Sequence, residues 1–131
     1  MLHLIEFVKF NWENSLEILL IDHGVENATE QPPVINFHVP DIYGRTSSNR
    51  CIIGEAKTHK DLDTKRSQNQ IFNFLKYAND HHCYFCLSVP FTCHRAASSR
   101  IMSIIEREDF RVDAYVVHEF GSRRLDRLCS N

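Results

Sequence analysis

The strongest limit on the fold comes from a short segment, residues 52–57, whose sequence is IIGEAK. In an extended strand, side chains alternate between faces, so Glu55 and Lys57 share one face while Gly54 and Ala56 share the other. The two isoleucines make the first part of the strand apolar on both faces, as in the middle of a covered sheet. Because charged groups in such a strand cost free energy, the acid and the base at its end indicate a chemical role.

A preceding segment is predicted to pair with this strand as a hairpin. The polar run 44–49 is typical of a turn between two strands, which we place at residues 34–43 and 50–57. Pro40 lacks a backbone donor and favours the end or the edge of a strand, and Asp41 follows it directly. Hairpin pairing would therefore bring Asp41 across from the acid of the IIGEAK strand.

Two carboxylates and an amine are then expected on one surface. Asp41 and Glu55 supply hard oxygen ligands, which suit Mg²⁺ or Mn²⁺, and such ions in turn hold phosphate oxygens. Lys57 on the same face completes a set of groups suited to cleaving a phosphodiester bond. The structural alternative is a surface ion pair between Glu55 and Lys57, because such pairs are common and contribute little to stability.

The order of these motifs resembles the PD-(D/E)XK nuclease superfamily, which has the restriction-endonuclease-like fold. By element order the likeness runs from residue 12 to about residue 117, and it is similar to compact branches such as Holliday junction resolvases and virus-type replication-repair nucleases. It implies an α/β fold with an αβββαβ core, a central mixed sheet flanked by helices. We expect a single domain of residues 1–131 in which residues 1–11 and 121–131 are peripheral. The matching motifs are Pro40-Asp41, Glu55-Ala56-Lys57 and a helix start at Ser67-Gln68.

This resemblance implies metal-dependent hydrolysis of nucleic-acid phosphodiester bonds, with DNA favoured over RNA and with internal cleavage. Asp41, Glu55 and the carbonyl of Ala56 would hold Mg²⁺ or Mn²⁺, and Lys57 would position or deprotonate the attacking water. The alternative is a non-catalytic module that retains the nuclease fold and binds nucleic acid or a protein. The complete set of two acids and a lysine speaks against it, because a degenerate copy would be free to lose a member.

A glutamate near the start of the chain is a further metal-ligand candidate. Apolar residues from Trp12 onward recur at helical spacing, which predicts a helix over residues 12–23 that stops at Gly24. In the resembled family a glutamate early in the first helix often joins the metal site, and Glu13 stands at the expected distance before the glycine. The alternative is a solvated helix glutamate.

A glutamine on the helix after the IIGEAK strand is expected to orient the nucleophile. Gln68 precedes apolar residues by three, four and seven positions, so it borders the buried face of that helix. Gln70 is expected to point further round toward solvent. A surface glutamine near a helix start is the alternative for Gln68.

The remaining elements complete an alternation of helices and strands. Apolar runs predict strands at residues 82–89 and 112–118, with a helix at residues 96–107 between them. Residues 4–10 fit either a strand or a helix. The resembled core needs two strands where only the stretch 34–43 is extended, so this stretch is one bent strand or residues 4–10 supply another.

Composition narrows the remaining possibilities. The five cysteines lie mostly in apolar segments, which favours buried thiols over a disulfide framework, and the strand-like setting of Cys83 and Cys86 disfavours a zinc site. The net charge of −2 argues against a strongly basic nucleic-acid surface, although Lys65-Arg66 and Arg123-Arg124 could line a positive groove.

Partners and location can be inferred by the same reasoning. No stretch is long enough and apolar enough to span a bilayer, and the start of the chain lacks signal-peptide features, so we expect an intracellular, cytoplasmic protein without membrane partners. Nucleic acid is the expected partner. Because double-strand cleavage by so small a unit needs two sites, we also expect a homodimer or a partner protein that targets it.

Overall fold

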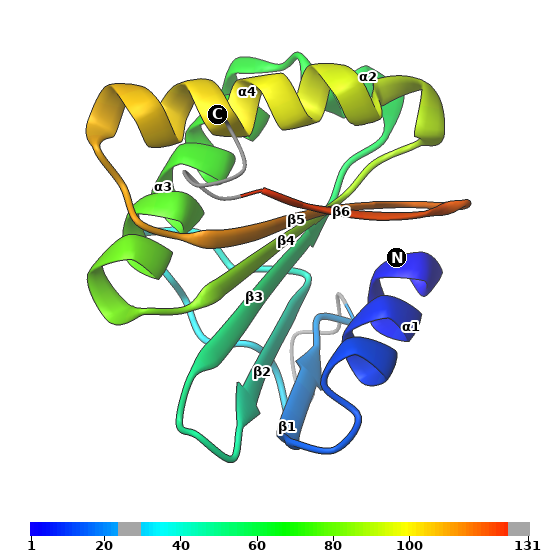
Figure 1. The fold of residues 1–131 in the computed structure, drawn as a ribbon, viewed down its shortest axis with the longest axis vertical. Helices are drawn as coiled ribbons and strands as arrows, with labels where there is room; N and C mark the ends of the chain where they lie inside the picture. The colour runs from blue at the N-terminus through cyan, green and yellow to red at the C-terminus, as the bar shows by residue number, and fades with distance from the viewer. Residues whose placement is uncertain (24–29, 126–131) are drawn as a thin grey trace.

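The computed structural model describes residues 1–23 and 30–125, and these form an α/β structure with one mixed sheet (Figure 1). The sheet has six strands, and helices cover both of its faces. The elements in chain order are α1 (Leu2–Asn11), β1 (Leu16–Ile21), β2 (Ile42–Thr46), β3 (Cys51–Ala56), α2 (His59–Leu62), α3 (Lys65–His81), β4 (Tyr84–Ser88), a 3₁₀ turn (Phe91–Cys93), α4 (His94–Glu108), β5 (Asp113–His118) and β6 (Gly121–Leu125).

The strands lie side by side in the order in which they occur in the chain. β1, β2 and β3 form an antiparallel meander, β3, β4 and β5 are parallel, and β6 returns antiparallel to β5. Because β3, β4 and β5 run the same way, α3 and α4 serve as the crossovers between them. The carboxyl ends of these three strands therefore lie at one edge of the sheet.

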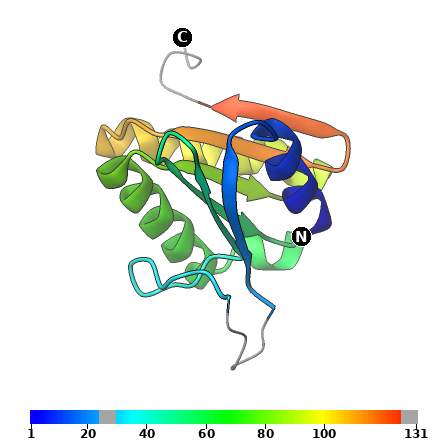
Figure 2. The same ribbon diagram turned by 90° about the horizontal axis from the view of Figure 1, so that it is seen from below.

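Two hydrophobic cores hold the layers together, one on each face of the sheet. α3 and α4 pack on the face that carries Ile53, Phe85 and Val116. The helix α1 packs on the opposite face, where Leu4 and Val8 are fully buried (Figures 1 and 2). The alternation of β3 explains the division, since its odd-numbered side chains face α3 and its even-numbered side chains face α1.

The expectation for the first part of the chain is wrong in two respects. Residues 16–21, predicted as part of a helix, form the strand β1, whereas the ambiguous stretch at residues 4–10 lies in α1. The extended stretch predicted at residues 34–43 is mostly irregular, and β2 starts only at Ile42. Gly24, the predicted helix stop, lies outside the described residues.

The two ends of the chain contribute more than the peripheral role predicted for residues 1–11 and 121–131. Leu4 and Val8 of α1 complete one core, and Leu125 of β6 is buried in the other. Within the part that the structure describes, both ends are therefore integral to the fold.

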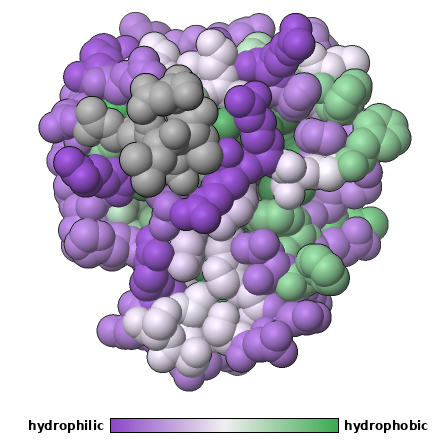
Figure 3. Space-filling view, in the orientation of Figure 1, coloured by the Kyte–Doolittle hydropathy of each residue, from purple (hydrophilic) through white to green (hydrophobic). Residues whose placement is uncertain are grey.

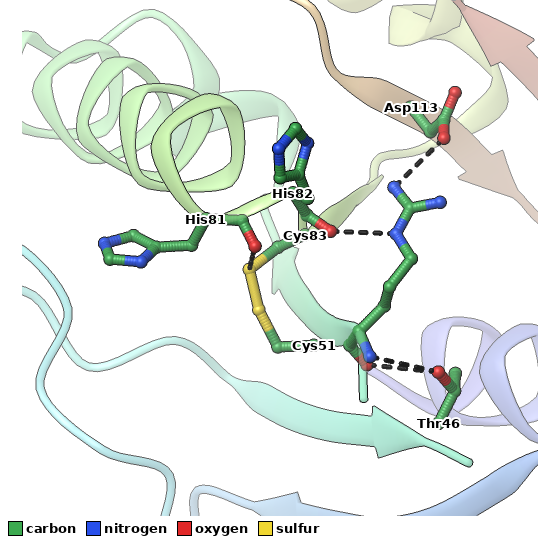
Figure 4. The surroundings of a disulfide bond; sticks show 7 residues. Thr46, Cys51, His81, His82, Cys83 and Asp113 are labelled. Atoms are coloured by element: carbon green, nitrogen blue, oxygen red, sulfur yellow. Dashed lines mark hydrogen bonds and ion pairs between the residues drawn. A yellow bond between two sulfur atoms is a disulfide. The ribbon is translucent and has the colours of Figure 1, made fainter. Parts of the chain in front are cut away.

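A disulfide joins Cys51 at the start of β3 to Cys83 just before β4 (Figure 4). This pairing contradicts the expectation that these cysteines are free thiols, whereas Cys86 and Cys93 are free and buried as expected. Arg50 reinforces the same corner, because it donates to the carbonyl of His82. The bond therefore ties together the entries of two neighbouring parallel strands.

The surface is mixed in character. In the view of Figure 3, hydrophilic side chains cover much of the molecule, and hydrophobic ones gather beside the tip of the β5–β6 hairpin and over α1. Phe10 and Phe120 are largely exposed in these two regions. Among the helices of residues 1–23 and 30–125, none has the length and apolar character needed to cross a bilayer.

Candidate active site

Asp41 and Glu55 meet at the point where β2 begins and β3 ends. The antiparallel register pairs Ile42 with Gly54, so the residue before one lies beside the residue after the other. The backbone N–H of Asp41 donates to Oε1 of Glu55 at 3.1 Å, and Oδ2 of Asp41 accepts from the backbone N–H of Ala56 at 2.7 Å. The hairpin thus brings together the two acids that the sequence singled out.

Glu55 is a buried acid, and its partners only partly offset the free-energy cost of burying its charge. It is 3% exposed, and burial is the main cause that raises its pKa from 4.5 to about 8. A hydrogen bond to the side chain of Asp41 and the negative charge of that side chain raise the pKa further, while Lys57 lowers it. At neutral pH, without a cation, Glu55 therefore keeps its proton and carries no charge.

Lys57 is held beside the acids by α3. Its Nζ lies 3.6 Å from Oε2 of Glu55 and donates a hydrogen bond to Oε1 of Gln70. Its backbone N–H donates to the carbonyl of Ser88 at 2.9 Å, which continues the pairing of β3 with β4. Only 12% of the lysine side chain is exposed, so its amine has a fixed place at the edge of the sheet.

Gln70 occupies the place that we expected Gln68 to take. Gln70 is 7% exposed and contacts Lys57, whereas Gln68 is exposed and its Nε2 donates to the carbonyl of Asp63. The structure therefore places Gln70, and not Gln68, beside Lys57. A signal was present in the sequence, because Gln70 stands four residues before the buried Phe74 and shares its helix face.

Glu13 also lies away from the acid pair. It is exposed in the turn before β1, and β1 begins at Leu16, which pairs with Thr46 at the far end of β2 from Asp41. The acid of this segment at the near end is Asp22, whose backbone N–H donates to the carbonyl of Asp41 at 2.8 Å. The prediction for Glu13 fails because residues 16–21 form a strand and not a helix. Glu13 precedes this strand, whereas the acid pair lies beyond its other end.

Positive charges act on His38, which lies three positions before Asp41 in the chain. The pKa of His38 is lowered, first by burial and then by the positive charges of Arg66 and Lys57. Arg66 is exposed in the first turn of α3. A neutral imidazole thus lies within the influence of two cations, one of which, Lys57, contacts Glu55, and this arrangement suits an anionic ligand.

The donor set fits a divalent cation that keeps part of its water. Asp41 and Glu55 offer carboxylate oxygens, and Ala56, with its carbonyl, adjoins both. Within residues 1–23 and 30–125 there is no cluster of three or more His, Cys, Asp or Glu residues placed to hold a metal. Mg²⁺ needs no such cluster, since one or two carboxylates with waters and substrate phosphates are its usual ligands.

A separate hollow of about 620 Å³ lies between α3 and α4. Its lining includes Gln68, Arg100 and Arg107, and none of the acid pair. Arg100 donates a hydrogen bond to the carbonyl of Leu62 at 2.6 Å, so its guanidinium group is engaged within the fold. The chemistry-bearing groups lie at the sheet edge instead.

Comparisons of the chain with models of protein families, with curated proteins and with solved structures found no match.

Proposed function

We propose that this protein is a metal-dependent nuclease that hydrolyses phosphodiester bonds of nucleic acid, with internal cleavage of DNA as the expected reaction. The observation that carries the proposal is the meeting of Asp41 and Glu55, with the amine of Lys57 3.6 Å from Glu55. A buried acid with a pKa of about 8 is costly to keep, and such groups are concentrated at functional sites.

The order of elements supports the same proposal. A helix, a three-stranded antiparallel meander, a helix and a parallel strand succeed one another from α1 to β4. Apart from the short helix α2 between β3 and α3, this order agrees with the αβββαβ core that the resemblance implies. Asp41 directly precedes the second strand and Glu55 lies near the end of the third, which supports the roles that the resemblance to the PD-(D/E)XK superfamily implies for them.

Each residue has a distinct task in the proposed reaction. Asp41 and Glu55, with the carbonyl of Ala56, would hold Mg²⁺ or Mn²⁺, which when bound supplies Lewis acidity toward the phosphate and lowers the pKa of a bound water. Lys57 carries three N–H donors, of which one is engaged by Gln70. The others can bind phosphate oxygens and offset the charge that develops there.

Gln70 acts as a positioning residue. Its side-chain oxygen accepts from Lys57, which keeps the amine at the sheet edge without adding a charge to the site. A carboxylate at this position would instead attract the amine as a counter-ion and compete with phosphate. An amide is therefore the suitable group for holding the lysine while leaving its charge to the substrate.

The rival proposal, a binding module that merely keeps the fold, is less well supported. A purely structural role for Glu55 would be served better by an apolar side chain, because burying an ionisable group beside another acid destabilises the fold. An ordinary surface ion pair is equally unsuitable as an explanation, since both partners are largely buried.

Cleavage assays test the proposal. Labelled single-stranded, duplex, flapped and branched DNA and matching RNA are incubated with the protein and with Mg²⁺, Mn²⁺ or EDTA. We expect metal-dependent products with free 5′ or 3′ ends, abolished by Lys57→Ala. Retention of full activity in Lys57→Ala would show that the products come from a contaminant or from another site.

A further inference from the structure

A tight turn of unusual composition lies just ahead of Asp41. Ile35 and His38 pair with each other through backbone hydrogen bonds of 2.7 and 3.0 Å, and Asn36 and Phe37 form the tip between them. Both tip residues have positive φ, 46° for Asn36 and 74° for Phe37. Such two-residue turns favour Asn followed by Gly, because glycine alone adopts the second position without strain.

Packing of the Phe37 side chain does not offset this backbone strain. It is 95% exposed, so its ring contributes almost nothing to the hydrophobic core. A bulky residue at positive φ is an outlier, and such outliers persist mainly where the surrounding structure imposes them and function uses them. The fold accounts for the turn but not for the phenylalanine at its tip.

The rest of the turn is anchored to α3. Ile35 is 2% exposed in the core, Nδ2 of Asn36 donates to the carbonyl of Asn73 at 3.2 Å, and the ring of His38 lies 6.0 Å from that of Phe74. Figure 2 shows this segment, drawn in cyan, running beside α3. Phe37 is therefore held outward on a rigid base, with little ordering left to lose on binding.

The turn belongs to the same side of the molecule as the acid pair. Phe37 lies four positions before Asp41, so their Cα atoms are at most about 14 Å apart. His38 follows Phe37 in the chain, and its pKa is lowered first by burial and then by the positive charges of Arg66 and Lys57. The turn that carries the exposed ring is thus near cationic groups through His38, which matches a ligand that alternates flat apolar bases with phosphates.

Resting on the proposed function, we propose that Phe37 is a stacking platform for an unpaired base close to the scissile phosphate, so that the substrate is single-stranded or locally unpaired. In a duplex both faces of an internal base are covered by its neighbours, whereas an unpaired base leaves a face for the ring.

Binding measurements in EDTA test this independently of cleavage. The probes are a short single-stranded oligonucleotide carrying 2-aminopurine and a fully paired duplex of the same sequence. Phe37→Ala should lower affinity for the single strand roughly five- to 100-fold, the loss expected for one base stack, and should relieve the quenching of 2-aminopurine. Phe37→Trp should retain both, and affinity for the duplex should be unchanged.

Two further variants separate stacking from structural effects. Phe10→Ala is the matched control, because Phe10 is 77% exposed on α1, across the sheet from the turn. It should leave single-strand binding intact. Phe37→Gly should be at least as thermally stable as the wild type, since glycine suits the positive φ, yet bind as weakly as Phe37→Ala.

Each outcome decides the proposal. Equal single-strand affinity in wild type and Phe37→Ala overturns it, even where wild type cleaves, and so does a Phe37→Ala change that only converts a dimer into monomers on sizing columns. Loss of single-strand binding in Phe37→Ala supports it, even where no metal yields cleavage and the hydrolase proposal fails. A wild type that neither binds nor cleaves any nucleic acid overturns both.

Discussion

The backbone N–H of Ala56 donates a hydrogen bond of 2.7 Å to Oδ2 of Asp41, fifteen residues earlier in the chain. The bond fixes one oxygen of the carboxylate and ties the end of β3 to the start of β2. Because the donor is a backbone group, its position depends on the hairpin and not on any side-chain rotamer. The candidate site is therefore held in shape by the sheet itself.

Asp41→Asn should remove metal binding while keeping the fold. The amide oxygen can still accept from Ala56, but the negative charge that a divalent cation requires is gone. Calorimetric titration with Mn²⁺ should show saturable binding to the wild type and none to the variant. Glu13→Gln is the control, because Glu13 is exposed at the far end of β1 and should leave binding unchanged. Wild-type Mn²⁺ binding by Asp41→Asn would contradict the assignment.

Stability without metal should fall as pH rises from about 4.5 to about 8. Glu55 keeps its proton to about pH 8 in the folded chain but loses it near 4.5 when unfolded, so the folded state binds more protons over this range. The free energy of unfolding should fall by at most about 1.4 kcal/mol per pH unit from this group. Urea unfolding of wild type and Glu55→Gln, compared at each pH, isolates the effect. A constant difference between the two proteins would count against the raised pKa.

Gln70→Ala should slow cleavage more than it weakens metal binding. Without the amide oxygen, Lys57 loses its hydrogen-bond partner on α3 and is positioned only by its ion pair with Glu55. We expect the turnover rate to fall by about tenfold to a hundredfold, the range of one lost charge-assisted hydrogen bond. Single-turnover rates and Mn²⁺ titrations measure the two quantities. Gln68→Ala is the matched control, and an equal loss of rate in that variant would refute the role of Gln70.

Gly54→Ala should destabilise the fold although it lies next to the site. A Cβ at Gly54 would overlap the side chain of Ile42 and crowd Leu4 at 3.2 Å, so the contact of β3 with α1 would have to shift. Overpacking of this kind typically costs about 1 to 3 kcal/mol. Denaturant unfolding checks the loss. A variant as stable as the wild type would mean that α1 adapts without cost.

Reduction of the Cys51–Cys83 disulfide should lower stability without exposing the site. The bond joins residues 32 apart, and a closed loop of that size is worth about 3 to 4 kcal/mol through the unfolded chain. Thermal unfolding with and without reductant measures the effect, and Cys51→Ser serves as the permanently reduced form. If reductant lowers the melting temperature of Cys51→Ser equally, the stabilising bond is not this one.

The hairpin and its acids were within reach of the sequence because their signals are local. Alternation over residues 52–57 fixed which side chains share a face, and the polar run 44–49 predicted a turn, so Asp41 and Glu55 could be paired. The turn is shorter than predicted, because β2 continues to Thr46 and pairs with β3 up to Arg45. The proposed roles of these residues remain predictions. Their neighbourhood, by contrast, was determined by the sequence, and the register of β2 with β3 confirms it.

The first strand and the site glutamine were decided only by tertiary structure. Leu16, Leu19 and Leu20 fit a helical stripe as well as a strand, because a short apolar run has no clear period. Its place at the sheet edge beside β2 settles the matter. The helical pattern placed Gln68 beside the apolar face of α3 and Gln70 toward solvent, whereas in the structure Gln68 is exposed and Gln70 is buried against Lys57. Local sequence patterns predict which side chains share a face of one element, whereas contacts between elements depend on how the helices pack on the sheet.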